Sequence, residues 1–84
     1  LKCYAFSGEI NSRVADVKPV LAAIKATYAD GKMFELDGIS VEYPDWHFNV
    51  RSSNTEPLVR LIVEARDPKV MAARRDELLK LIRG

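Results

Sequence analysis

Two segments of the chain, residues 46–51 and 58–65, alternate apolar and polar side chains, and this pattern constrains the fold more than any other feature. In the first segment Trp46, Phe48 and Val50 are separated by single polar residues. A period of two is typical of a β-strand with one buried face and one open face. Because only a short polar loop separates the two segments, we expect them to form an antiparallel pair.

An amphipathic helix is predicted between residues 16 and 31. Asp16 is a typical N-cap, and Pro19 fits the first turn, where its missing N–H would have no helical partner. Gly31 is predicted to end the helix as its C′ residue. The apolar face consists of residues at helical spacing: Val17, Val20, Leu21, Ile24 and Tyr28.

A second helix is predicted from the N-cap Asp67 and the first helical residue Pro68 to about Arg83. Its apolar face is formed by Met71, Leu78 and Ile82. The pair Arg74-Arg75 is interpreted as part of its solvated face.

Shorter strands are predicted elsewhere. One or two strand pieces occupy Leu1–Val14. Lys32–Leu36 leads into Asp37-Gly38, the strongest short hairpin signal in the chain. Ile39–Tyr43 alternates like a half-buried strand and ends at the turn Pro44-Asp45.

The resulting order is strand, helix, a run of antiparallel strands and a final helix, which predicts an α+β fold. Both helices are expected to cover one face of an antiparallel sheet. The other face would be open to water or to a partner, and it would carry His47, Asn49 and Arg51. We interpret His47 as an exposed residue of this face rather than as a general acid or base.

Length and composition limit the possible functions. With 84 residues the chain can bury one small core and not two, so we expect residues 1–84 to be a single domain and not a self-contained enzyme. A formal net charge of +1 indicates neither nucleic acid nor membrane. No apolar run approaches the roughly 20 residues of a membrane span, so no membrane partner is expected. The lone Cys3 cannot form an internal disulfide, which fits a reducing compartment.

The most informative segment for function is the loop Arg51-Ser52-Ser53-Asn54-Thr55-Glu56-Pro57. The backbone N–H groups and hydroxyls of such a turn can form a concavity for an anion. Arg51 would supply the charge and the bidentate geometry that suit a phosphate. The alternative is a solvated hairpin turn, because the same residue types favour turns.

This loop, followed by Leu58-Val-Arg-Leu61 and Val63-Glu-Ala65, resembles the C-terminal, fourth domain of the α-D-phosphohexomutases. In that superfamily an Arg-x-Ser-(Asn/Gly)-Thr-Glu-Pro loop binds the phosphate of the substrate. Ser7-Gly-Glu-Ile-Asn-Ser12 and Leu36-Asp-Gly-Ile-Ser-Val-Glu42 resemble the bacterial phosphomannomutase/phosphoglucomutase branch. The resemblance covers essentially the whole chain.

The resemblance implies a fold like that of the TATA-box-binding protein and a function inside a larger cytoplasmic enzyme. Such an enzyme reversibly interconverts hexose 1-phosphates and hexose 6-phosphates of mannose or glucose. Three further domains provide a phosphoserine, a Mg²⁺ loop of aspartates and a sugar-recognition loop. Those motifs are absent from this sequence, so the resemblance implies no catalytic residue, metal or cofactor here, and the isolated domain is expected to be inactive. For the whole enzyme it implies Mg²⁺ and a hexose 1,6-bisphosphate intermediate.

Carried over by position, the resemblance assigns the non-transferred phosphate of a phosphosugar substrate to Arg51, Ser53, Asn54 and Thr55. Ser52 occupies the variable position and should contribute its backbone at most, while Glu56 and Pro57 should shape the loop. Arg60 matches an arginine common in the Glu-Pro-x-x-Arg version of the motif. It is expected in a supporting role, either as a second anion contact or as a salt-bridge partner of Glu64.

Two alternatives from other functional classes stay open. Helix-backed antiparallel sheets often bind RNA, and six of the seven arginines lie in the second half of the chain. However, the sequence has no aromatic RNP-type segment, no GxxG clamp and no strongly basic balance, so a nucleic-acid partner is not expected. The other alternative is a protein-interaction module.

Overall fold

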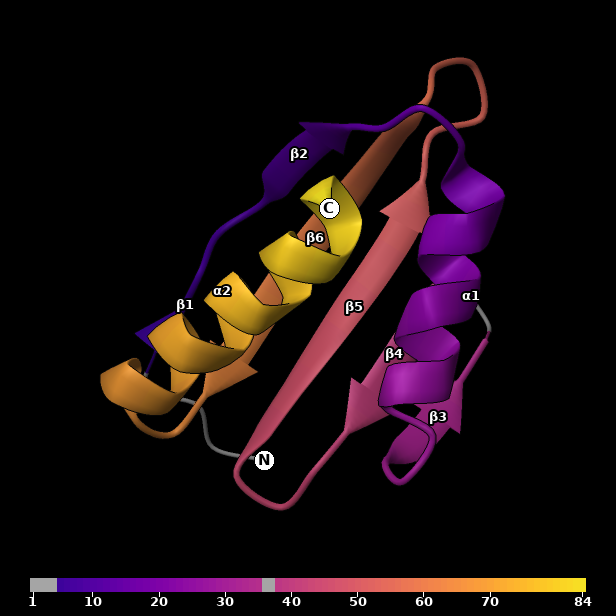
Figure 1. Ribbon diagram of the computed structural model, residues 1–84. Helices are drawn as coiled ribbons and strands as arrows, with labels where there is room; N and C mark the ends of the chain where they lie inside the picture. The colour runs from indigo at the N-terminus through magenta and orange to yellow at the C-terminus, as the bar shows by residue number, and fades with distance from the viewer. Residues whose placement is uncertain (1–4, 36–37) are drawn as a thin grey trace.

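The computed structural model describes residues 5–35 and 38–84. Its strands are β1 (Ala5–Phe6), β2 (Ile10–Arg13), β3 (Lys32–Phe34), β4 (Ile39–Glu42), β5 (Trp46–Ser52) and β6 (Leu58–Ala65), and its helices are α1 (Val17–Thr27) and α2 (Pro68–Arg83). The strands form one antiparallel sheet in the order β1-β6-β5-β4-β3, and β2 also pairs with β6 (Figure 1). The predicted α+β fold is confirmed.

The apolar core lies between the sheet and the two helices, which cover the same face (Figure 1). Alternate residues of the two central strands are buried: Trp46, Phe48, Val50, Val59, Leu61, Val63 and Ala65. The helices contribute Ile24, Tyr28, Leu78 and Ile82 to the same core. The period of two therefore determines which side chains face the helices and which remain on the open face.

Both helices begin where the sequence predicts. The Asp16 carboxylate accepts a hydrogen bond from the Lys18 N–H at 3.1 Å, and the Asp67 carboxylate accepts one from the Lys69 N–H at 2.8 Å. These contacts satisfy N–H groups that have no partner within the first helical turn. Neither helix of the described chain has the length and apolar character that crossing a membrane requires.

The prediction that Gly31 is the C′ residue of α1 is wrong. The helix ends at Thr27 with Tyr28 as its C-cap, and Gly31 has no positive φ. Glycine is needed there because a Cβ would lie 2.8 Å from Cζ of Tyr43 and would also overlap Val41. A close approach of strand β4, and not a helix stop, explains this residue.

Some predicted features fall partly outside the described residues. Cys3, the first residues of the segment Leu1–Val14, and Leu36-Asp37 of the expected hairpin are among them. Within the described part, β3 and β4 pair antiparallel across this turn, and Gly38 has a φ of +79°.

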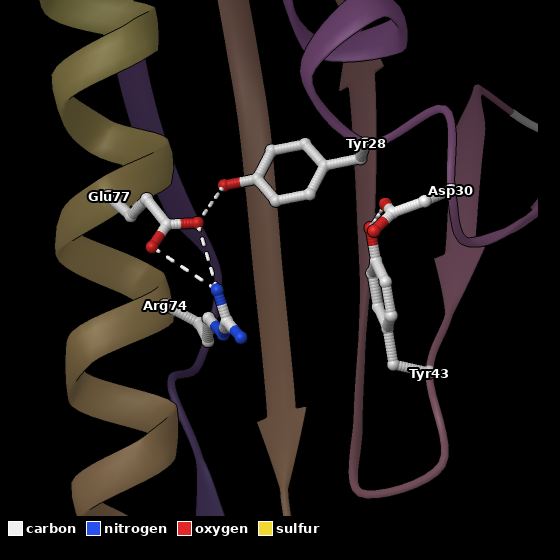
Figure 2. A network of polar contacts seen from close by, with 5 residues as sticks. All are labelled: Tyr28, Asp30, Tyr43, Arg74 and Glu77. Carbon is white, nitrogen blue, oxygen red and sulfur yellow. Dashed lines mark hydrogen bonds and ion pairs between the residues drawn. The ribbon is translucent and has the colours of Figure 1, made fainter.

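A polar network connects the C-terminal end of α1 with the middle of α2 (Figure 2). It lies next to Trp46 at the start of β5. The Tyr28 hydroxyl donates to Oε1 of Glu77 at 2.7 Å, and Arg74 donates to both oxygens of the same carboxylate at 3.2 and 3.3 Å. The Arg74 guanidinium also lies 4.8 Å from the centre of a Trp46 ring. The Arg74 side chain is 42% exposed, so it lies on the solvated side of α2 as predicted, and it also pairs with an acid and an aromatic ring.

The same region contains a second tyrosine with a carboxylate partner. The Tyr43 hydroxyl donates to Asp30 at 2.7 Å, and its ring stacks on Trp46 at 4.8 Å. Burial and then the hydrogen bond to Asp30 raise the pKa of Tyr43 to about 12. Burial and then the contact with Glu77 raise the pKa of Tyr28 as well.

Candidate functional site

A hollow of about 290 Å³ lies at the opposite end of the β5–β6 hairpin from this network. Its lining contains eight residues: Asn11, Arg51, Ser52, Ser53, Asn54, Glu56, Leu58 and Arg60. They come from the loop, from the strand ends on either side of it and from β2. The lining has two guanidinium groups, two amides and two hydroxyls against a single carboxylate, which is a donor-rich composition suited to an anion.

The two arginines of the hollow lie directly opposite each other in the antiparallel register. Arg51 on β5 pairs with Arg60 on β6, and Asn11 on β2 continues the same row on the far side of Arg60. By the alternation of these strands the three side chains share the open face. Two guanidinium groups therefore lie side by side at the hollow, an arrangement in which both can donate to the oxygens of one anion.

Arg60 contacts two side chains from the segment that includes β2. Its Nε lies 3.2 Å from Oε1 of Glu9 and donates to Oδ1 of Asn11 at 3.3 Å. The alternative of a salt bridge with Glu64 is wrong, because residues four apart on a strand are separated by about 13 Å. Glu64 instead lies beside His47, with 3.3 Å between Oε1 and Nε2.

The loop has a defined backbone. The Ser53 N–H donates to the Leu58 carbonyl at 3.0 Å, and the Ser53 hydroxyl accepts from the Thr55 N–H at 3.3 Å. The Pro57 carbonyl accepts from the Val14 N–H at 2.8 Å, which attaches the loop to the segment after β2. These contacts fix the backbone on which the polar side chains are presented.

The structure brings together most of the residues that the sequence assigned to an anion site. Arg51, Ser53 and Asn54 line the hollow, as do Ser52 and Arg60. Thr55 is exposed and does not belong to the lining. Glu56 also lines the hollow, in addition to its carbonyl accepting from the Leu58 N–H at 2.8 Å.

Comparison with known protein families shows to which family the domain belongs. The phosphoglucomutase/phosphomannomutase C-terminal domain matches residues 9–81, which include the hollow, its loop, the whole of α1 and most of α2. The chain belongs to this family. The resemblance read from the loop motif is thereby confirmed for the domain.

Several curated relatives carry the same domain. Phosphomannomutases of Escherichia coli and Methanocaldococcus jannaschii are 48% and 49% identical over 92% and 94% of the chain. Phosphohexose mutases of Xanthomonas campestris pv. campestris are 47% identical over 93% of it. In each case the match covers 18% of the relative's own length, so the chain spans less than a fifth of these proteins.

Sequence reasoning missed Asn11 as part of the lining of the hollow and Glu9 as a partner of Arg60. Both lie in the segment Ser7–Ser12 that carried part of the resemblance, but no role was assigned to them. Their proximity to Arg60 depends on the pairing of β2 with β6, between residues 49 apart for Asn11. In the structure Asn11 lies between the partly buried Ile10 and the buried Ser12, which places it on the open face. A polar serine at position 12 gives no sequence signal of this alternation.

Among the described residues no group of three or more histidines, cysteines or acidic residues could hold a metal ion. The hollow itself is lined by two arginines, which repel cations. The residues present therefore do not fit Mg²⁺.

The open face continues from the hollow into a wider concavity of about 600 Å³. Here Asn49 donates to Oγ of Ser40 at 2.9 Å, and His47 pairs with Glu64. His47 is thus partly buried beside a carboxylate, on the open face as the alternation predicts. Phe34, 38% exposed, forms one side of this concavity.

Proposed function

We propose that the hollow binds the phosphate of a hexose phosphate, and that the chain is the substrate-phosphate-binding domain of an α-D-phosphohexomutase. The observation that carries the proposal is the convergence of Arg51, Arg60 and the loop donors on one hollow. The names of the relatives, phosphomannomutases and phosphohexose mutases, support a hexose phosphate as the ligand.

Each lining group has a distinct role in this proposal. Arg51 supplies a planar pair of N–H donors to two phosphate oxygens, and Arg60 acts as the second cationic contact. Ser53 and Asn54 supply uncharged donors, and Ser52 contributes its backbone. Thr55 stays in the proposed set on the strength of the loop motif alone.

The placement of the aromatic side chains fits phosphate binding better than RNA binding. Single-stranded RNA is usually recognised by aromatic rings on an open sheet face. The aromatic residues of the central strands, Trp46 and Phe48, are each 1% exposed and face the helices. The open face of these strands carries His47, Asn49, Arg51, Leu58, Arg60, Ile62 and Glu64.

The proposed contribution to catalysis is positioning. In phosphoryl transfer a protein mainly orients groups and stabilises charge. Binding the non-reacting phosphate provides energy that orients the reacting hydroxyl elsewhere on the sugar. A cradle that recognises phosphate accepts a sugar in either orientation, which an interconversion of 1- and 6-phosphates requires.

The remaining chemistry belongs to the parent enzyme in this proposal. Residues 1–84 form one domain that works with three others, in the cytoplasm. Mg²⁺ and a hexose 1,6-bisphosphate intermediate are used by those domains, and the isolated 84-residue chain has no mutase activity.

A titration of the ¹⁵N-labelled chain tests the proposal. Glucose 6-phosphate and mannose 6-phosphate should shift the amide signals of residues 51–55, whereas glucose without phosphate and single-stranded RNA should not. Absence of any shift with the sugar phosphates would overturn the proposed function. Shifts spread over the open face with RNA alone would favour the nucleic-acid alternative.

A further inference from the structure

We propose that Asn11 of β2 is a direct donor to the bound anion, so that three segments of the chain, and not the loop alone, surround the phosphate. This inference rests on the proposed function and adds a contact from a residue 40 positions before the loop. It assigns to β2 a binding role in addition to its pairing with β6.

The orientation of the Asn11 amide follows from its partner. The Nε of Arg60 can only donate, so the group 3.3 Å away must be the acceptor Oδ1 of Asn11. The Nδ2 group, with its two hydrogens, is then directed away from Arg60 Nε. Among the described residues it has no hydrogen-bond partner, so both donors are available to a ligand.

The position of Asn11 places these donors at the hollow. Asn11 belongs to the lining and lies in one row with Arg60 and Arg51 across the three strands β2, β6 and β5. The neighbouring Ser12 faces the other way, 4% exposed, and accepts a hydrogen bond from Arg83. The backbone of β2 therefore fixes Asn11 on the open face.

The contacts of Arg60 support a shared function. Glu9 and Asn11 both contact Nε, and no other partner among the described residues contacts the guanidinium. The two terminal nitrogens of Arg60 thus remain for the anion, next to the Asn11 amide. An anion in the hollow would contact a loop, a β6 guanidinium and a β2 amide together.

Nuclear magnetic resonance of the 84-residue chain gives the direct readout. Inorganic phosphate, and then glucose 6-phosphate, should shift the side-chain amide signals of Asn11 with the same affinity as the backbone amides of residues 53–54. The side-chain amide of Asn49 is the internal control, because Asn49 lies on the same face, bonds to Ser40 and is not part of the lining.

Variants separate a direct contact from an effect through Arg60. Asn11→Ala should weaken phosphate binding about 10-fold, the loss expected when one hydrogen bond to a charged group is removed. The matched variant Asn49→Ala should change it less than about 2-fold, and thermal unfolding checks that both variants fold. Adding Asn11→Ala to Arg60→Ala should weaken binding further if the amide contacts the anion itself.

The outcomes distinguish the two proposals. If phosphate shifts the loop amides but not the Asn11 amide, or if Asn11→Ala adds nothing to Arg60→Ala, the direct contact is overturned and the proposed function stands. If neither phosphate nor glucose 6-phosphate shifts any loop amide, both are overturned. Parallel shifts of loop and Asn11 amides with an added loss in the double variant support both.

Discussion

Two ends of the β5–β6 hairpin carry arginines in opposite situations. Next to the start of β5, Arg74 of α2 donates to both oxygens of Glu77 (Figure 2). The same guanidinium packs over Trp46. At the loop end, Arg51 and Arg60 lie directly opposite each other, on a face that no helix covers. Arg74 packs over an aromatic ring of the core, whereas Arg51 and Arg60 lie side by side in the lining of a hollow.

The difference distinguishes structural residues from binding residues. A cation with an acidic and an aromatic partner stabilises the folded chain. Two guanidinium groups side by side at a hollow can both donate to one bound anion. Substitutions at the network should therefore change stability, and substitutions at the hollow should change binding.

The largest effect is expected from Arg51→Ala in a full-length phosphohexomutase that carries this domain. Loss of the charged contact, worth about 1.5–4 kcal/mol, should raise KM and lower kcat/KM by about 10- to 1000-fold. Arg74→Ala is the matched control, because it removes an arginine from the other end and should leave kcat/KM within about 2-fold. Equal kinetics of the Arg51 variant and the unmodified enzyme would contradict the phosphate role.

Gly31→Ala should lower the stability of the fold next to the network. The added methyl would lie 2.8 Å from the Tyr43 ring and against Val41, so β4 or the ring must move. Overpacking of this kind costs about 1–3 kcal/mol of unfolding free energy, measurable by urea denaturation. An unchanged denaturation midpoint would show that the turn after α1 accommodates the methyl group.

Tyr28→Phe removes one partly buried hydrogen bond and keeps the ring in the core. The hydroxyl donates to Glu77 at 2.7 Å, and the residue is 3% exposed, so the unfolding free energy should fall by about 1 kcal/mol. Tyr43→Phe, which loses a more exposed bond to Asp30, should have a smaller effect. Reversal of this order would mean that the Tyr28 contact contributes little. Phosphate affinity should not change in either variant.

The smallest effect is expected from alkaline pH. The pKa of Tyr43 rises from 10.0 to about 12 in the folded chain, and that of Tyr28 is also raised, so the folded state favours the protonated hydroxyls. This stabilisation is complete below pH 10 and is lost as pH increases from 10 toward 12. Denaturation measured over this range should show the loss, and the double variant Tyr28→Phe with Tyr43→Phe should reduce it. If the unfolding free energy of the double variant depended on pH in the same way, the pH dependence would belong to other groups.

Local patterns predicted much of the fold. The alternation in residues 46–51 and 58–65 placed Trp46 and Phe48 in the core, because side chains on a strand point to opposite faces in turn. Asp16 and Asp67 gave the helix starts, since a capping carboxylate acts within its own first turn. Gly31 was misinterpreted because the approach of β4 is a contact between separate elements.

The candidate site was predictable to the extent that it lies in one continuous segment. The loop from Arg51 to Pro57 carries its own motif, so its residues were identified together. The partners of Arg60 were not, because Glu9 and Asn11 reach it through the pairing of β2 with β6. The pairing with Glu64, one of the two alternatives for Arg60, is absent for the related reason that residues four apart on a strand lie about 13 Å apart.

A crystal structure of the chain with glucose 6-phosphate would test the central claim most directly. The account predicts the phosphate in the hollow, with its oxygens contacting the guanidinium of Arg51 and the loop at Ser53 and Asn54. A phosphate bound elsewhere on the molecule, with the Arg51–Arg60 hollow free of ligand, would contradict it.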